Sequence, residues 1–142
     1  MALWTNDLTM REVALGAAQQ GGLACFFQAG RYALGAAMTG DLLDGTHSQE
    51  AIYRAVGGGL EVFLLVVAGL RLLTGRGLIW GGLAVGLVLF ELLKKIVAFD
   101  ILGTGGILLG GLLTIAMING LRGAWVLRRS GPDPEEAAAI FE

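Results

Sequence analysis

Residues Gly57 to Leu70 read GGGLEVFLLVVAGL, a run of glycine and apolar residues that one acid, Glu61, interrupts. A helix needs roughly 20 mainly apolar residues to cross the hydrocarbon core of a bilayer. The run lies inside a longer apolar segment, residues 51–73, which reaches that length. The sequence therefore predicts a transmembrane helix with a carboxyl group near its middle.

The composition of the whole chain indicates the same environment. Hydrophobic residues make up 55% of the 142 residues and charged residues only 15%, whereas about a quarter of the residues in soluble domains are charged. The 24 glycines follow no three-residue period and are accompanied by only two prolines, which excludes a collagen-like chain. A net charge of -2 without a clustered basic stripe gives no sign of nucleic-acid binding.

Three further segments are long enough to cross a bilayer. The segment 13–38 is the least apolar of them because it contains three glutamines and Arg31. Leaving it in water would expose the apolar stretch LACFF, Leu23–Phe27, whereas neighbouring helices can hydrogen bond neutral amides. We therefore expect an all-α, integral membrane four-helix bundle with spans at about 13–38, 51–73, 78–99 and 103–127.

The distribution of lysine and arginine predicts the orientation of this bundle. The loop 41–50 contains three acids and neither lysine nor arginine. The opposite side collects six arginines and the three tryptophans: Arg11, Arg71, Arg76, Arg122, Arg128, Arg129, Trp4, Trp80 and Trp125. Because cytoplasmic loops are enriched in basic residues, we expect both termini in the cytoplasm and a bacterial inner-membrane location. One domain, 1–131, would hold the spans, followed by a short acidic cytoplasmic tail at 132–142.

Four ionisable residues within the predicted spans form a candidate ion or proton site. Glu61 lies about 15 Å from the outer surface, at a rise of about 1.5 Å per residue. An ionised carboxylate at that depth is costly without a partner, and Arg31 and Lys94 are the available cations. Glu91 precedes Lys94 by three positions, so the two share one helix face. Structural hydrogen bonds and ion pairs that hold the bundle together are the alternative interpretation.

Glycines at four-residue spacing predict faces at which helices approach closely. Helix association in lipid depends on close packing, for which small residues are enriched. The candidate packing residues are Gly82, Gly86, Gly106, Gly110 and Gly120. Such faces can serve contacts within the chain, a homo-oligomer or a larger membrane complex.

The motifs of the common enzyme classes are missing from the sequence. It has no nucleophile elbow, no phosphate-binding loop, no HExxH and no CxxC, and the predicted spans contain no histidine for haem. We expect no enzyme activity, no cofactor and no metal. The favoured function is a small membrane accessory or assembly protein, which packs in the lipid bilayer as a homo-oligomer or with a larger membrane-protein complex. The alternative is a small proton-coupled transporter or ion channel that uses Glu61 and Glu91.

Overall fold

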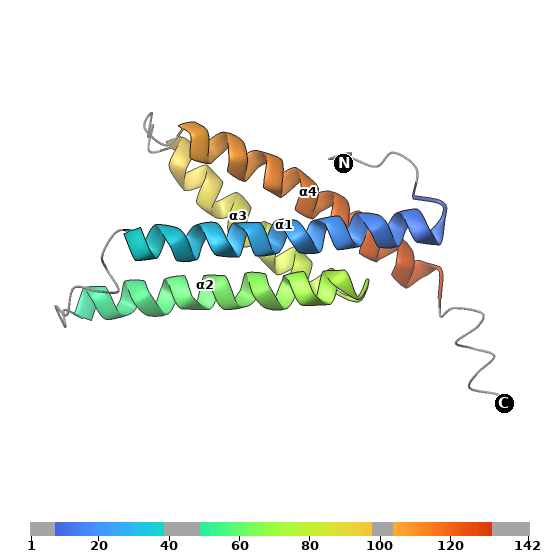
Figure 1. Cartoon of the computed structure of the whole chain (residues 1–142), viewed down its shortest axis with the longest axis horizontal. Helices are drawn as coiled ribbons and strands as arrows, with labels where there is room; N and C mark the ends of the chain where they lie inside the picture. The colour runs from blue at the N-terminus through green and yellow to red at the C-terminus, as the bar shows by residue number, and fades with distance from the viewer. Residues whose placement is uncertain (1–7, 39–48, 98–103, 132–142) are drawn as a thin grey trace.

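The computed structural model describes residues 8–38, 49–97 and 104–131. All secondary structure in these ranges is helical (Figure 1). The four helices are α1 (Arg11–Met38), α2 (Gln49–Leu73), α3 (Leu78–Val97) and α4 (Thr104–Arg129). The expected all-α chain with four helices is therefore confirmed, and the described ranges contain no strand. The predicted acidic tail, 132–142, lies outside the described residues.

Two of the helices, α2 and α4, are each followed by a turn that contains a glycine with a positive φ. At the end of α2, the Gly75 N–H donates to the carbonyl of Leu72 at 2.9 Å and the Arg76 N–H donates to the carbonyl of Arg71 at 3.1 Å. These two bonds form a Schellman motif, which requires a left-handed residue, and Gly75 has a φ of +70°. Gly131, with a φ of +77°, follows the end of α4 in the same way.

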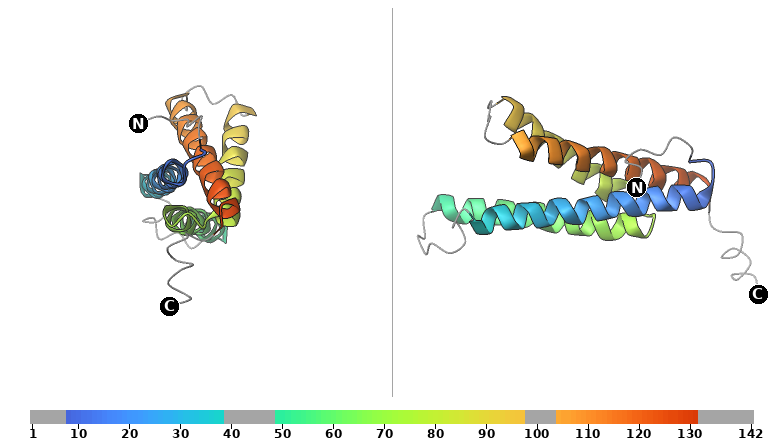
Figure 2. Two further views of the ribbon diagram at one scale, coloured as in Figure 1. Left: turned by 90° about the vertical axis from the view of Figure 1, so that its right-hand side faces the viewer. Right: turned by 45° about the horizontal axis from the view of Figure 1, so that its top comes forward.

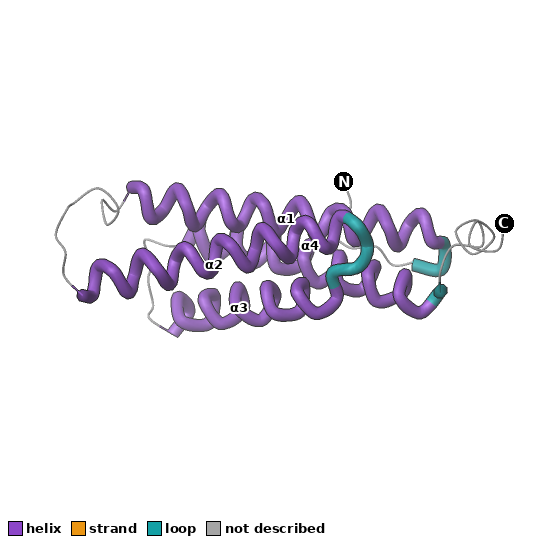
Figure 3. The backbone as a smooth tube through the Cα atoms, turned by 90° about the horizontal axis from the view of Figure 1, so that it is seen from below, coloured by secondary structure: helices purple, strands orange, loops and turns teal. Residues whose placement is uncertain are grey.

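The helices are arranged up and down, so that each lies beside the next along the chain. α1 also packs along α4, which places it between α2 and α4, while α1 and α3 are the diagonal pair (Figure 3). The α1–α2 hairpin and the α3–α4 hairpin diverge toward the end at which α1 ends and α4 begins (Figures 1 and 2). The bundle is therefore closed at one end and splayed at the other.

Contacts between glycine backbones determine where α1 meets its neighbours. A Cβ atom added to Gly21 would lie 2.6 Å from the Cα atom of Gly120 in α4. A Cβ on Gly22 would lie 2.9 Å from the carbonyl oxygen of Gly69 in α2. Both distances are too short for a real carbon atom, so only glycine permits these helices to lie so close.

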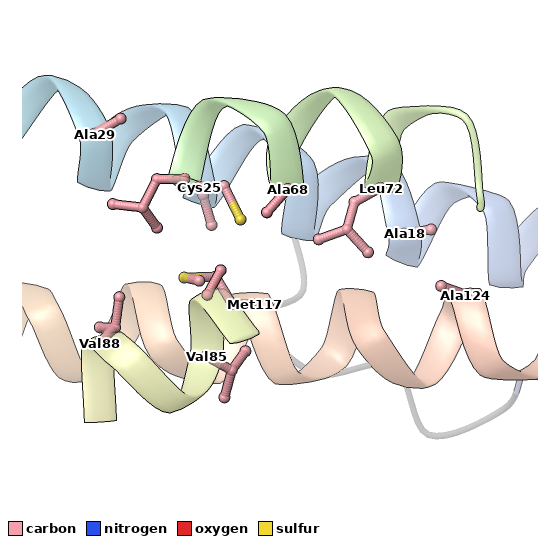
Figure 4. Close-up of a cluster of buried hydrophobic side chains, with 12 residues drawn as sticks. Ala18, Cys25, Ala29, Ala68, Leu72, Val85, Val88, Met117 and Ala124 are labelled. Atoms are coloured by element: carbon pink, nitrogen blue, oxygen red, sulfur yellow. The ribbon is translucent and has the colours of Figure 1, made fainter. Parts of the chain in front are cut away.

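Small residues form most of the buried core, beside Leu65, Leu72 and Met117, and many other large apolar side chains lie outside it. Figure 4 shows this core between the helices, and its small members are Ala18, Ala24, Cys25, Ala29, Ala68, Ala84 and Ala124. By contrast, Phe27 is 71% exposed, Ile79 70% and Leu108 66%. A soluble bundle buries its large apolar residues, so this distribution is the reverse of what water favours.

Two helices contain segments that are long and apolar enough to cross a membrane, Ala55–Leu73 in α2 and Gly106–Arg129 in α4. Only 22% of the residues in the apolar window of the first and 39% in that of the second are buried within the bundle. A core helix of a soluble protein would be mostly buried. Over the described residues, α1 and α3 do not meet the same criterion. The four-span arrangement therefore stays a prediction.

The glycine contact between α1 and α4 can be tested by adding one methyl group. Gly120→Ala should lower the free energy of unfolding by about 2 kcal/mol, because the methyl group would overlap the backbone of Gly21. Gly111→Ala in the same helix is the matched control, since a Cβ atom there meets nothing within 4 Å. Reversible unfolding in mixed detergent micelles measures both variants, and equal stabilities would contradict the contact.

Candidate functional site

Polar side chains from three helices gather toward the splayed end of the bundle. Tyr32 of α1 interacts electrostatically with Glu61 of α2 and with Glu91 of α3. Lys94 of α3 interacts with the same three groups. The structure therefore brings together three of the four residues predicted as an ion or proton site, Glu61, Glu91 and Lys94, and adds Tyr32 to them. We call these four residues the polar cluster.

Glu91 and Lys94 form the local ion pair that their three-residue spacing predicts. The Lys94 ammonium group also lies 5.1 Å from the centre of the Phe90 ring, within the range of a cation–π interaction. The side chain of Lys94 is 55% exposed, whereas that of Glu91 is 22% exposed. The lysine therefore extends from the bundle surface, as a lysine near the end of a membrane span would do.

Glu61 approaches this pair without joining it. Its carboxyl group is affected by the charges of Glu91 and Lys94, and it is partly buried. Within the described part of the chain, its carboxylate has no hydrogen bond and no ion pair shorter than 4 Å. Glu61 is thus the acid of the polar cluster whose carboxylate is not paired with another described residue.

Arg31 contacts α4 rather than the acids. Its Nη1 atom donates to the carbonyl oxygen of Gly106 at 3.3 Å. A Cβ atom on Gly110 would lie 3.2 Å from the same nitrogen, so the guanidinium group occupies space that this glycine leaves free. Arg31 lies about 15 Å along α1 from Gly21, at a point where α1 and α4 have diverged and a long side chain is needed to join them. Arg31 also lies 5.9 Å from the centre of the Tyr32 ring and interacts electrostatically with Tyr32, so it borders the polar cluster. Among the described residues, no direct contact joins Arg31 to Glu61 or Glu91.

Gln28, like Tyr32, is a polar residue of this region that the sequence did not single out as a site residue. Only 1% of its surface is exposed, and its side chain hydrogen bonds Tyr32. Its Oε1 atom has no hydrogen-bond partner among the described residues, which is costly for a buried carbonyl. Gln28 and Tyr32 are four positions apart and share a helix face. This spacing is the sequence signal that would have indicated that the two side chains interact.

The five glycines predicted as packing residues have different surroundings. Gly120 lies against the backbone of Gly21, and Gly110 lies against Arg31. A Cβ atom on Gly82, Gly86 or Gly106 would meet nothing within 4 Å. Of these five glycines, the two in contact with other parts of the chain are on α4, whereas Gly82 and Gly86 on α3 border open space.

Comparisons with known proteins add no family to these observations. No family model, no curated protein and no solved structure matches the chain. Among the described residues, no three or more histidine, cysteine or acidic side chains are grouped so that they could hold a metal ion. Function must therefore be argued from the polar cluster, the glycine faces and the exposed surface.

The buried amide of Gln28 can be tested with a pair of variants. Tyr32→Phe should lower the free energy of unfolding by about 1 kcal/mol, because it removes the hydroxyl group that the amide contacts. Adding Gln28→Met should restore or exceed the original stability, because it removes the unpartnered Oε1 atom at similar volume. Unfolding in mixed micelles provides the comparison. If the double variant is less stable than the Tyr32→Phe single variant, the Oε1 atom of Gln28 does have a hydrogen-bond partner in the folded protein.

Proposed function

We propose that this chain is a four-span membrane protein that assembles through the outer face of α3, as a homo-oligomer or with a larger membrane complex. The single observation that carries the proposal is the open space at Gly82 and Gly86. Both termini face the cytoplasm in this proposal, and the membrane is a bacterial inner membrane.

The membrane part of the proposal is supported by the surface of the bundle. Large apolar side chains are exposed on all four helices, for example Phe27, Phe63, Leu83 and Leu108. Hydrocarbon solvates such side chains at no cost, whereas water does not. Six arginines, together with Trp80 and Trp125, belong to the end at which α1 and α3 begin, as expected for a cytoplasmic boundary.

The assembly part of the proposal is supported by the contrast between two kinds of glycine. Gly21, Gly22 and Gly120 are used to bring helices of this chain together. Gly82 and Gly86 are one helical turn apart and have no neighbour within 4 Å of a Cβ atom. Exposed apolar side chains flank them, including Ile79, Leu83 and Phe90. The result is a shallow apolar face on which the backbone of a second helix can come close.

Larger side chains on this face of α3 should dissociate the assembly. Gly82→Leu with Gly86→Leu is expected to raise the dissociation constant by at least about tenfold, equivalent to about 1.4 kcal/mol, because the new side chains hold the second helix away. Light scattering and co-purification in mild detergent measure the assembly. Gly30→Leu on α1 is the matched control, because Gly30 also borders open space. If the double variant keeps the native assembly, the α3 face is not the interface.

Transport of protons or of a small cation is a second candidate function, favoured by the polar cluster. Glu61, Tyr32 and Glu91 come from three helices and interact with one another, and Tyr32 is hydrogen bonded to the buried Gln28. Carboxyl and hydroxyl groups at this depth can accept and release protons in sequence. In this candidate function Glu61 is the central proton carrier, and Arg31 is a structural link to α4.

The transport candidate predicts a specific loss on neutralising Glu61. Glu61→Gln should reduce proton or cation flux in reconstituted vesicles to the level of protein-free vesicles, since an amide cannot carry a proton between sites. Glu50→Gln, an exposed acid in the first turn of the same helix, should leave the flux unchanged. Flux that persists in Glu61→Gln eliminates the transport candidate.

A further inference from the structure

A pocket lies at the closed end of the bundle, where α1 and α3 begin and α2 and α4 end. Its volume is about 720 Å³, within the range of ligand sites. Four arginines line it, and we call it the arginine pocket: Arg11, Arg71, Arg76 and Arg128. The polar cluster lies toward the opposite end of the helices, so the two sites are separate.

The arginine pocket is lined by positive charge. Its four arginines come from the first turn of α1, the last turn of α2, the α2–α3 turn and the end of α4, and none of the described lining residues is an acid. Arg71, Arg76 and Arg128 place like charges around one hollow, and a bound anion lowers their mutual repulsion. Guanidinium groups are suited to phosphate because their planar N–H donors can bind two of its oxygens at once.

The backbone of two of these arginines, Arg71 at the end of α2 and Arg76 in the turn that follows, is held in place. Arg71 accepts a backbone hydrogen bond from Arg76, so the two residues are tied together by the Schellman motif. A Cβ atom on Gly75 would lie 2.8 Å from Leu127 of α4, which shows how closely the turn packs on that helix. The backbone around the arginine pocket is therefore fixed, while the exposed arginine side chains become ordered when an anion binds.

The remaining wall of the arginine pocket is apolar. Leu15, Leu127 and Ile79 contribute to it, and Trp80 stands beside them and is 38% exposed. Free phosphate gains nothing from an apolar wall, whereas the glycerol and upper acyl chains of a phospholipid do. Tryptophan is also enriched at the level of lipid headgroups. A phosphate anion that carries an apolar tail fits both halves of this pocket.

We infer that the arginine pocket binds the phosphate group of an anionic phospholipid at the cytoplasmic boundary of the bundle. Basic pockets between membrane helices on this side recognise such headgroups. The inference rests on the membrane location of the proposed function; the arginine pocket shares Ile79 with the α3 face but neither Gly82 nor Gly86. Loss of assembly in the Gly82 and Gly86 variants therefore does not affect it.

Native mass spectrometry of the full chain, titrated with phosphatidylglycerol and separately with phosphatidylcholine, tests the inference. One phosphatidylglycerol should bind per chain at least about tenfold more tightly than phosphatidylcholine. Arg71→Gln and Arg76→Gln should each weaken that binding by about tenfold, through loss of charge-assisted hydrogen bonds. Arg129→Gln is the matched control, because it removes one charge from the same end at a residue that stacks on Trp125 and does not line the pocket.

The outcomes separate a site from general surface charge and a lipid from free phosphate. Equal weakening in all three variants, or equal binding of the two lipids, would overturn the inference. Inorganic phosphate is the second probe: displacement of phosphatidylglycerol by micromolar phosphate would identify a soluble ligand and overturn the lipid source. Fluorescence of Trp80, in a chain with Trp4→Phe and Trp125→Phe, should change on adding phosphatidylglycerol and not on adding phosphate.

Discussion

The backbone contact between Gly21 and Gly120 fixes the distance between α1 and α4, and the positions of other groups follow from it. Because the helices touch there and diverge beyond, Arg31 has room to reach the carbonyl of Gly106. The same divergence leaves Gln28 and Tyr32 facing the acids of α2 and α3. At the other end, the turn at Gly75 packs on α4 and brings the arginines around one hollow.

Small residues fill most of the core of this bundle, and many large apolar side chains lie on its outside. Phe27, Ile79 and Leu108 are exposed, whereas Leu65, Leu72 and Met117 are the large side chains fully buried in the core. Close packing of small residues therefore contributes to stability, together with a few polar contacts such as the bond from Thr114 to the Gly110 carbonyl at 2.7 Å. The proposed membrane location depends on this distribution of side-chain size.

Local sequence signals predicted the helices well because the information they need is local. The lengths of the apolar segments place each described helix end within two residues of the predicted span. The pairing of Glu91 with Lys94 follows from spacing alone. The partner of Arg31 is 75 residues away, and no local pattern indicates it.

The roles of the glycines were beyond prediction for a related reason. Gly82 and Gly110 belong to the same kind of four-residue pattern, yet one borders open space and the other contacts Arg31. The difference depends on how each helix is rotated about its axis, which contacts between helices decide. Glu61 was identified as unusual from its place within the apolar segment, but its interaction with Tyr32 depends on how α1 is arranged.

The position of α1 between α2 and α4 has a consequence for biosynthesis. α1 is made first, yet Gly21 meets its partner Gly120 only after nearly the whole chain has been translated. Until then, the amide-rich first helix lacks half of the surface that accommodates it. Its final packing is therefore a late event, and a chain interrupted before α4 would leave the Gly21 face of α1 uncovered.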